Sequence, residues 1–305
     1  MPVTSGLRAS PYPRPSVVDQ SPLPPYGEPV SSDTAIVHRP AGLPPIKLSA
    51  PAHNGFWEIP VVYEDAHLLA IDKPAGLPTS PDRYDPDRPN LMKLLHGGIE
   101  TGRPWAVARG LTYLSNAHRL DFETSGVLLL AKDRTALVGL ADQFGSEKPA
   151  KVYVALSKGT PAEKEFEVDL KLKADDRQPG RMRWSKDGKK SLTRFRVLET
   201  FGGVSLIECH PLTARTHQIR VHLLSAGLPI LGDPVYGDGQ RLYLSQLKTN
   251  YRPKGDEPER PLTPRMALHA WKLRVKHPVT GADIDIEAPW PRDLEVALKY
   301  LRKYQ

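Results

Sequence analysis

One short stretch of the sequence carries its densest group of reactive side chains. It contains His118, Arg119, Asp121 and Thr124, and it ends at the apolar run 127–131. Catalytic groups are often held on loops by a rigid scaffold, and the apolar neighbours of Asp121 would desolvate its carboxylate. The stretch could therefore supply a catalytic carboxylate. The structural alternative is that Asp121 caps a turn and pairs with Arg119, while Thr124 makes ordinary turn hydrogen bonds.

A second cluster, at 214–222, combines two arginines, two histidines and a glutamine at the start of a predicted helix. A buried arginine usually marks a carboxylate or phosphate partner. Arg215 and the helix N-terminus together would suit a phosphate, whereas Arg220 lies further along and could point inward to a carboxylate. The alternative is a solvated basic face of the helix.

A third candidate is Tyr153, which lies in an alternating segment, 151–156. On a strand, Tyr153 would share one face with Lys151 and Ala155. Such a tyrosine either packs within a sheet or offers a stacking platform for a nucleobase. The single cysteine and the scattered histidines show no metal-ligand spacing, so we predict no metal site.

The elements around these residues are mostly short strands joined in hairpins. We expect strands at 61–63, 68–71, 127–131, 151–156, 166–172, 193–198, 204–209, 268–275 and 284–286. We expect helices at 91–95, from the N-cap Asp133 to Phe144, at 216–226 and at 292–303, with polar connections at 174–190 and 237–264. A regular βαβ alternation is absent. The pattern therefore predicts an α+β fold with a mostly antiparallel mixed β-sheet and flanking helices.

The N-terminal sixth of the chain has a different composition. Twelve of the 32 prolines lie in residues 1–52, and proline interrupts both helices and central strands. We therefore predict a largely disordered arm over 1–52, with order beginning near Phe56 and one domain over 53–305. A passive tail is favoured over a functional arm, and the segment has no secretory signal pattern.

Overall composition excludes several classes of protein. No apolar run is long enough for a transmembrane helix, and one cysteine excludes an intrachain disulfide. The formal net charge of the 305 residues is +7, which is compatible with a polyanionic partner.

Five motifs in order resemble the RluA-type pseudouridine synthases. The match covers roughly residues 56–290, and it comprises His118-Arg119-Leu120-Asp121-x-x-Thr124-Ser125-Gly126; the upstream stretch 73–77; Lys151-x-Tyr153-x-Ala155; 215–222 with 231–237; and 268–270 with 277–281. Together these motifs are specific, although any one alone would be weak. The resemblance implies a pseudouridine synthase-like fold and an isomerase that converts uridine in RNA to its C-glycoside.

The resemblance also implies roles for the three candidates above. Asp121 would be the catalytic aspartate, which either attacks the sugar or abstracts a proton from it. Tyr153 would stack on the flipped uracil and assist proton transfer at C5. Arg220 would pair with Asp121, keep it ionised and help to fill the space left by the extruded base.

Five more residues would bind the substrate. Leu268 would pack against the uracil or the tyrosine ring, Arg119 and Arg215 would contact RNA phosphates, and His118 and Thr124 belong to the same loop as the aspartate. No cofactor is implied, since the reaction involves neither redox chemistry nor group transfer.

Two departures from the family pattern bear on these expectations. Ala214 stands where the family usually has glycine, and a turn with positive φ would strain it. Many relatives carry a small N-terminal RNA-binding domain, which residues 1–52 are too proline-rich to build. Substrate selection would then fall to the catalytic domain, the arm and the basic insertion 237–264, which could equally be a passive loop.

Two other functions compete with an RNA uridine isomerase. One is an RNA-binding or ribosome-assembly factor with this fold and little catalysis. The other is a glycoside hydrolase, which would need a second carboxylate about 5–10 Å from the first; Glu123 and Asp233 are the candidates. For the isomerase, both large-subunit ribosomal RNA and transfer RNA are open as substrates, and we expect a cytoplasmic monomer.

Overall fold

The computed structural model describes residues 44–82, 85–252 and 257–305. The strands are β1 (Ile46–Ala50), β2 (Gly55–Ile59), β3 (Val61–Glu64), β4 (Leu68–Lys73), β5 (Ser115–Asn116), β6 (Ser125–Ala131), β7 (Ala150–Lys158), β8 (Glu165–Ala174), β9 (Met182–Trp184), β10 (Lys189–Phe201), β11 (Val204–Pro211), β12 (Leu268–Lys276) and β13 (Asp283–Glu287). The helices are η1 (Pro51–His53), α1 (Leu91–Glu100), α2 (Pro104–Val107), α3 (Arg134–Gly145), α4 (Gln218–Ser225), α5 (Leu244–Leu247) and α6 (Arg292–Tyr304).

One large mixed sheet organises the described residues. Eleven of their strands form it in the order β3-β4-β6-β12-β7-β11-β10-β8-β9, with β13 beside β12 and β5 beside β6. Its pairings are antiparallel except for that of β6 with β12. The predicted α+β fold with a mostly antiparallel mixed sheet is confirmed.

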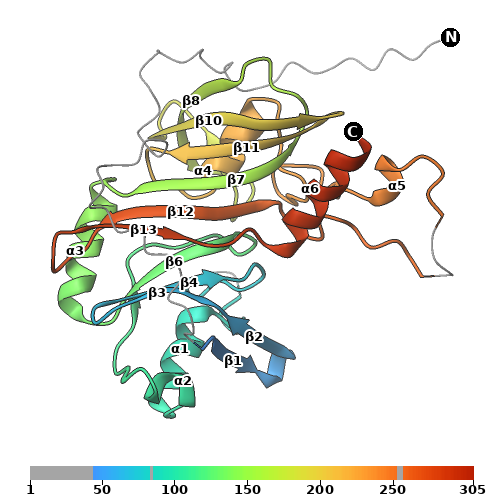
Figure 1. Ribbon diagram of the computed structural model, residues 1–305. Helices are drawn as coiled ribbons and strands as arrows, with labels where there is room; N and C mark the ends of the chain where they lie inside the picture. The colour runs from blue at the N-terminus through green and yellow to red at the C-terminus, as the bar shows by residue number, and fades with distance from the viewer. Residues whose placement is uncertain (1–43, 83–84, 253–256) are drawn as a thin grey trace, which may run out of the picture.

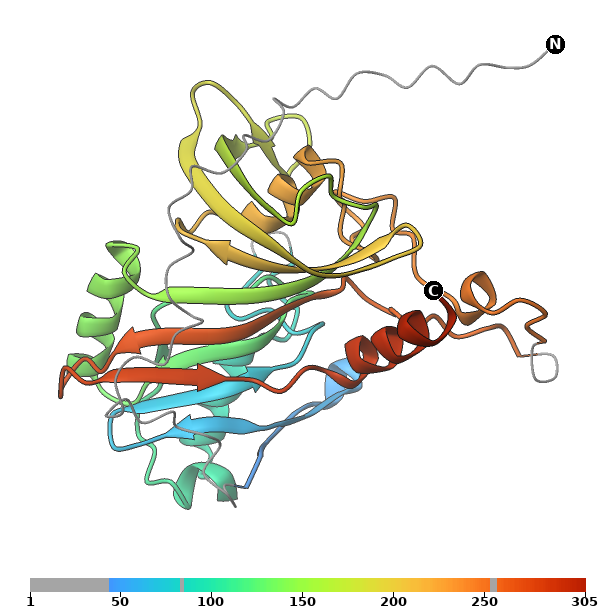
Figure 2. The same cartoon turned by 45° about the horizontal axis from the view of Figure 1, so that its top comes forward.

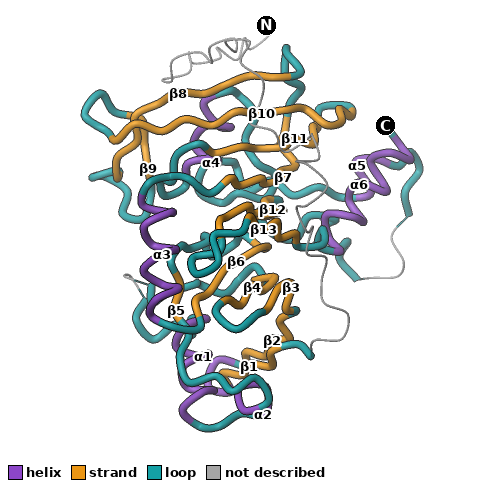
Figure 3. The backbone as a smooth tube through the Cα atoms, turned by 60° about the vertical axis from the view of Figure 1, so that its left-hand side comes forward, coloured by secondary structure: helices purple, strands orange, loops and turns teal. Residues whose placement is uncertain are grey.

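The helices flank this sheet in separate places. Figure 1 shows β12 and β13 across the middle of the molecule, with β7, β8, β10 and β11 on one side and β3, β4 and β6 on the other. Helix α4 packs against β8 to β11, and Figure 2 shows it lying against these curved strands. Figure 3 shows α1 and α2 at the end formed by β1 and β2, far from α4.

Strand β6 is buried on both faces, which explains its unbroken apolar sequence. Because successive side chains alternate, Leu128 and Leu130 enter the core beneath α1, whereas Val127, Leu129 and Ala131 enter the core beside α3. The run continues directly from the loop that carries Asp121. A strand anchored on both faces therefore fixes one end of that loop.

The parallel contact between β6 and β12 joins the two halves of the sheet. Ser125 lies opposite His269, and Gly126 lies opposite Ala270. Gly126 has a φ of 116°, and a Cβ atom there would come within 2.1 Å of the carbonyl oxygen of Ala270. Only glycine permits this approach, which brings the N-terminal ends of both strands to the same place.

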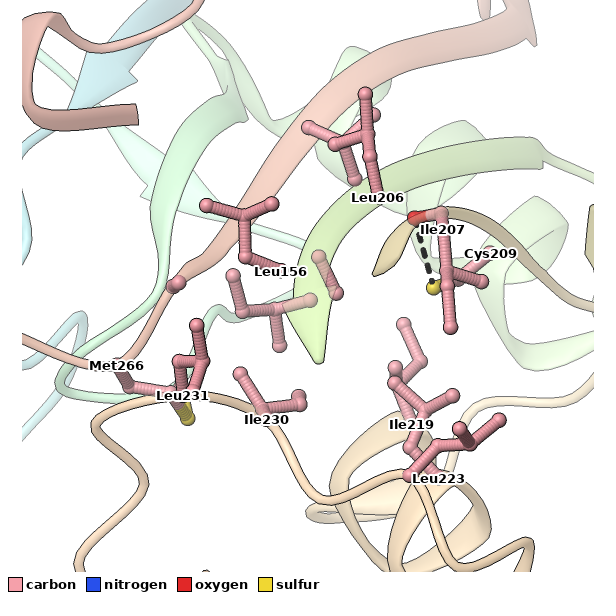
Figure 4. Packing of buried hydrophobic residues seen from close by; sticks show 14 of the residues in the cluster. Leu156, Leu206, Ile207, Cys209, Ile219, Leu223, Ile230, Leu231 and Met266 are labelled. Carbon is pink, nitrogen blue, oxygen red and sulfur yellow. Dashed lines mark hydrogen bonds between the residues drawn. The ribbon is translucent and has the colours of Figure 1, made fainter. Parts of the chain in front are cut away.

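The largest core cluster lies between α4 and the strands β7 and β11. Figure 4 shows Ile219 and Leu223 of α4 facing the strands that carry Leu156 and Ile207, with Ile230 beside Ile219. These side chains are at most 6% exposed. Burial of this apolar stripe holds α4, and with it the arginine-rich segment, against the sheet.

The predicted start of order near Phe56 is wrong. Strand β1 lies inside the segment predicted to be a disordered arm, and it pairs with β2, which follows that segment. Its alternate residues Ile46, Leu48 and Ala50 are buried, so a short apolar alternation between prolines is sufficient for an edge strand. The arm prediction for residues 1–43 lies outside the described residues.

Other boundaries also differ from the predictions. The connection 174–190 contains the short strand β9, which extends the edge of the sheet beside β8. The helix predicted at 91–95 continues to Glu100. Within the excursion predicted at 237–264, which the structure describes except for 253–256, the chain forms the short helix α5. The predicted N-cap is confirmed, because Asp133 accepts a hydrogen bond from the backbone N–H of Ala136 at 2.8 Å.

None of the helices among the described residues has the length and apolar character that crossing a bilayer requires.

The buried side chain of His222 should make the folded protein less stable in mild acid. His222 is fully buried between the hydroxyls of Ser191 and Thr193, and burial lowers its pKa to about 3. In the unfolded chain this histidine binds a proton near pH 6.5. The stability that depends on neutral His222 is therefore fully present above pH 6.5 and is lost as the pH falls toward 3. For this group the free energy of unfolding should fall by about 2 kcal/mol between pH 7 and pH 5.

Urea denaturation at both pH values measures this effect. His222→Gln should be less stable overall, because it removes a buried ring. Its free energy of unfolding should nevertheless fall less between pH 7 and pH 5, by the amount that His222 contributes in the wild type. An unchanged pH difference in the variant would contradict the assignment.

Candidate active site

A cavity of about 450 Å³ opens where the two halves of the sheet meet. The loop before β6, the end of α3, strand β7, the segment leading into α4 and the first residue of β12 line it. All eight predicted site residues contribute to this lining: His118, Arg119, Asp121, Thr124, Tyr153, Arg215, Arg220 and Leu268. Residues as much as 150 positions apart in the chain (118 and 268) are thus brought to one place by the fold.

Hydrogen bonds on both sides fix the backbone around Asp121. The hydroxyl of Thr79 donates to the carbonyl oxygen of Leu120 at 3.1 Å and accepts from the N–H of Leu120 at 3.2 Å. On the other side, the N–H of Gly76 donates to the carbonyl oxygen of Phe122 at 2.8 Å. The rigid 74–79 loop therefore clamps the residues that precede and follow the aspartate.

Lys73 supports the clamp from within the protein. Its side chain is fully buried, and Nζ donates to the carbonyl oxygens of Pro74 at 2.7 Å and Leu77 at 2.8 Å. Burial lowers the pKa of Lys73 to about 7, although the nearby negative charge of Asp121 opposes the shift. The lysine thus ties the loop together and adds positive potential near the aspartate.

The guanidinium of Arg220 lies between two carboxylates. Its Nε and Nη2 atoms donate to Asp233 at 2.7 and 2.8 Å, and Nη1 is 3.5 Å from Oδ2 of Asp121. Burial disfavours the charged guanidinium, but the hydrogen bond and negative charge of Asp233, together with the charge of Asp121, raise the pKa of Arg220. Asp233 therefore fixes the arginine, and the arginine presents its remaining edge to Asp121.

Two apolar groups face the cavity from the paired strands β7 and β12. Tyr153 lies opposite Ala270 in this pairing, and Leu268, 4% exposed, lies opposite Ala155. Burial and the nearby charge of Asp121 raise the pKa of Tyr153. Its phenol is therefore protonated at neutral pH and could donate as well as stack.

Two other predicted site residues, His118 and Thr124, are held by contacts within the protein. The ring of His118 stacks on Phe144 with centroids 4.4 Å apart, and Nε2 accepts the backbone N–H of Leu129 at 3.0 Å. Burial lowers the pKa of His118 to about 3, so it is neutral. Thr124 is buried, and its N–H donates to the carbonyl oxygen of Asp121 at 3.2 Å.

The two arginines predicted to bind phosphate occupy different settings. Arg119 is exposed at the rim. Arg215 pairs with Glu147 at 2.8 Å and donates to the carbonyl oxygen of Lys190 at 3.0 Å. The structural alternative, in which Asp121 pairs with Arg119, does not occur, because Asp121 pairs with Arg220.

The backbone before α4 differs from the prediction. The helix begins at Gln218 rather than near Thr216, because Oε1 of Gln218 accepts the N–H of Arg215 at 3.0 Å and closes a turn. Ala214 does not have a positive φ, whereas His217 has a φ of 54°. Ala214 therefore causes no strain, and the unusual conformation lies three residues later.

The contacts that Asp233, His217 and Tyr236 make beside the cavity were not predicted from the sequence. Asp233 was considered only as a second carboxylate for hydrolysis, although a buried arginine in the neighbouring motif was a signal for its partner. In the structure Asp233 is fully buried and paired with Arg220. Among the described residues that line the cavity, Asp121 is the only one with a carboxylate. The arrangement therefore does not favour a two-carboxylate hydrolase.

The described residues contain no group of three or more His, Cys, Asp or Glu side chains that could hold a metal ion. What the cavity offers instead is one carboxylate next to an arginine, with an aromatic ring and a leucine beside it. Such a site can accommodate a flat, uncharged ring and act on the atom attached to it.

Comparisons with known proteins agree with this geometry. Residues 67–225 match the family described as RNA pseudouridylate synthase. Ribosomal large subunit pseudouridine synthase D of Zymomonas mobilis subsp. mobilis is 34% identical over 261 residues, which cover 84% of this chain and 77% of that protein. Ribosomal large subunit pseudouridine synthase C of Escherichia coli K12 is 36% identical over 252 residues, which cover 79% and 70%.

A solved structure supports the same assignment. Human RNA pseudouridylate synthase domain containing 4 matches with a TM-score of 0.61 at 26% identity, over 79% of this chain and 92% of that one. Sequence motifs, family match and fold therefore agree. The chain belongs to the RNA pseudouridylate synthase family and is an isomerase that forms pseudouridine in RNA.

Proposed function

We propose that this enzyme isomerises a specific uridine of large-subunit ribosomal RNA, and that Asp121 carries the chemistry. The observation that supports it most strongly is the position of Asp121, alone among described carboxylates in the cavity and next to a buried arginine. The names of the relatives support ribosomal RNA over transfer RNA as the substrate. The activity itself follows from the family, and the residue roles and the substrate are the proposal.

The reaction moves one bond and needs no external reactant. The bond between N1 of uracil and C1′ of the ribose breaks, the base turns, and C5 bonds to C1′. C5 then loses its proton and N1 gains one, so the atoms balance. Asp121 either attacks the sugar or removes a proton from it, and both roles require an ionised carboxylate.

The substrate base must leave its stack to reach the cavity, which costs a few kcal/mol. The ring of Tyr153 provides a stacking surface, and Leu268 packs beside it; such contacts offset part of that cost. Arg119, which is exposed and lines the cavity, would contact a phosphate of the flipped nucleotide. Arg215 would have to exchange Glu147 for phosphate to do the same.

Pseudouridine mapping of total RNA tests the substrate. RNA from cells with and without the gene is labelled with a reagent that stops reverse transcription at pseudouridine. A stop in large-subunit ribosomal RNA should disappear without the gene and should return with the wild type but not with Asp121→Ala. A lost stop in transfer RNA alone would overturn the proposed substrate.

Replacing Tyr153 with phenylalanine should separate stacking from proton transfer. Tyr153→Phe keeps the ring and should bind RNA like the wild type, but it lacks the phenol and should react about 10²-fold or more slowly. Single-turnover rates and RNA-binding curves measure the two effects. An unchanged rate would restrict Tyr153 to packing.

The competing function is an RNA-binding or ribosome-assembly factor with little catalysis. It predicts that Asp121→Ala leaves the cellular role of the protein intact, whereas the isomerase proposal predicts its loss where the modification matters. We also propose that the protein acts as a monomer, because the RNA already supplies the large partner. The cytoplasmic location stays a prediction.

A further inference from the structure

His217 approaches the same carboxylate oxygen as Arg220. Its Nε2 atom lies 3.8 Å from Oδ2 of Asp121, and Nη1 of Arg220 lies 3.5 Å from that oxygen. Two nitrogens therefore face Oδ2 from α4 and from the residue before it. Both separations are longer than a tight hydrogen bond, which leaves room for the carboxylate to tighten against them when a substrate closes the site.

A chain of hydrogen bonds determines which nitrogen of His217 carries the proton. The backbone N–H of Met182 donates to the phenol oxygen of Tyr236 at 2.6 Å, and this oxygen lies 2.8 Å from Nδ1 of His217. Nε2 faces a carboxylate oxygen, which can only accept, so the tautomer that satisfies both contacts of the ring has the phenol donate to Nδ1. Nδ1 then accepts, and a neutral His217 must carry its hydrogen on Nε2, toward Asp121.

Both rings remain in the protonation state that this chain requires. Burial raises the pKa of Tyr236 and keeps its phenol protonated. Burial also lowers the pKa of His217, although the charge of Asp121 opposes the shift. The charged and titratable groups around His217 are Asp121, Arg220, Asp233, Arg119 and Tyr236, with Arg181 over the Tyr236 ring.

The backbone of His217 is held in an uncommon conformation. Its φ of 54° lies in the left-handed region, which only a few per cent of residues other than glycine adopt. The position directly precedes α4, and the ring meets that of Tyr236 edge to face with centroids 5.5 Å apart. The surrounding contacts thus hold the ring between Tyr236 and Asp121.

We propose that His217 is a positioning residue for Asp121. Its Nε2–H and the guanidinium of Arg220 together hold Oδ2, so that Oδ1, for which the described residues provide no hydrogen-bond partner, is the oxygen that acts on the nucleotide. Tyr236 acts at one remove, by holding His217 in the required tautomer. The proposal rests on the catalytic role of Asp121 proposed above.

Two substitutions of His217 separate positioning from packing. His217→Asn suits the left-handed backbone and places an amide near Nδ1, within reach of Tyr236 but not of Asp121. His217→Gln extends an amide N–H to the place of Nε2. In single-turnover assays at saturating RNA, the asparagine variant should react about 10²-fold more slowly than the wild type, and the glutamine variant should recover much of the loss.

RNA affinity should be unchanged in both variants, and the exposed His53→Asn is the matched control. Equal rates for the asparagine variant and the wild type would overturn the proposal. So would a loss of RNA affinity that accounts for the whole effect.

A second measurement does not depend on activity. In the free protein, the ¹³C and ¹⁵N chemical shifts of the His217 ring report its tautomer. The wild type should show hydrogen on Nε2, and Tyr236→Phe should lose this preference while the protein stays folded. Hydrogen on Nδ1 in the wild type would overturn the inference about His217 whether or not the proposed role of Asp121 is correct.

Discussion

Asp121→Asn is expected to reduce pseudouridine formation by at least about 10³-fold. The amide has nearly the same shape as the carboxylate, but it is neither a nucleophile nor a base at neutral pH. The hydrogen bonds that clamp the loop involve the backbone of Leu120 and Phe122 and do not use the aspartate side chain. The fold and the RNA affinity should therefore survive. Single-turnover conversion of a transcribed RNA, with thermal unfolding and RNA binding measured alongside, provides the test.

Glu123→Gln is the matched control for this experiment. Glu123 lies two positions away and undergoes the same change of carboxylate to amide, but its Oε2 accepts the backbone N–H of Met266 at 3.2 Å, outside the cavity lining. Its turnover should remain within a few-fold of the wild type. Normal turnover in Asp121→Asn would refute the mechanism, and an equal loss in both variants would point to a general disturbance of the loop.

Arg220→Met should destabilise the fold as well as the active site. Removal of the guanidinium leaves Asp233 as a fully buried carboxylate with no counter-charge, although it keeps the backbone N–H groups of Val235 and Tyr236. Breaking one side of a buried ion pair typically costs about 3–5 kcal/mol. The free energy of unfolding from urea titration should fall by about this amount at pH 7.

The double variant Arg220→Met/Asp233→Asn separates the two effects. It removes the unpaired charge, so most of the lost stability should return, whereas activity should remain low because Asp121 still lacks its arginine. The deficit of the single variant should also shrink as the pH falls, beginning above the ordinary carboxyl pKa, because burial without the arginine raises the pKa of Asp233 in the folded variant. Equal stability of the single variant and the wild type would show that the pair contributes little to folding.

The active-site loop and its strand were predictable because local patterns specify both. Reactive residues at 118–124 precede an apolar run, and a fully buried strand needs only that run and its neighbours. The motif resemblance then pointed to eight site residues, all of which line the cavity, even though their long-range contacts leave no local pattern. Strand β1 was missed because two flanking prolines outweighed a three-residue apolar alternation.

The hydrogen-bond partners within the site were not predictable in the same way. Arg220 was expected to pair with Asp121, yet its two shortest contacts are to Asp233. Which of two carboxylates receives the bidentate edge depends on the turn after α4 and on backbone donors, neither of which residue type determines. The left-handed conformation of His217 likewise arises from packing, since nothing in its local sequence requires it.

The parallel contact between β6 and β12 also sets the order in which the enzyme can mature. Ser125 and His269, which pair across this contact, lie 144 positions apart. Contacts between such distant segments form late, because the chain must close a long loop before they contribute. Synthesis proceeds from the N-terminus, so Asp121 and Tyr153 leave the ribosome well before Leu268 arrives to complete the cavity. A growing chain therefore lacks the complete cavity until β12 has been made and has docked beside β6 and β7.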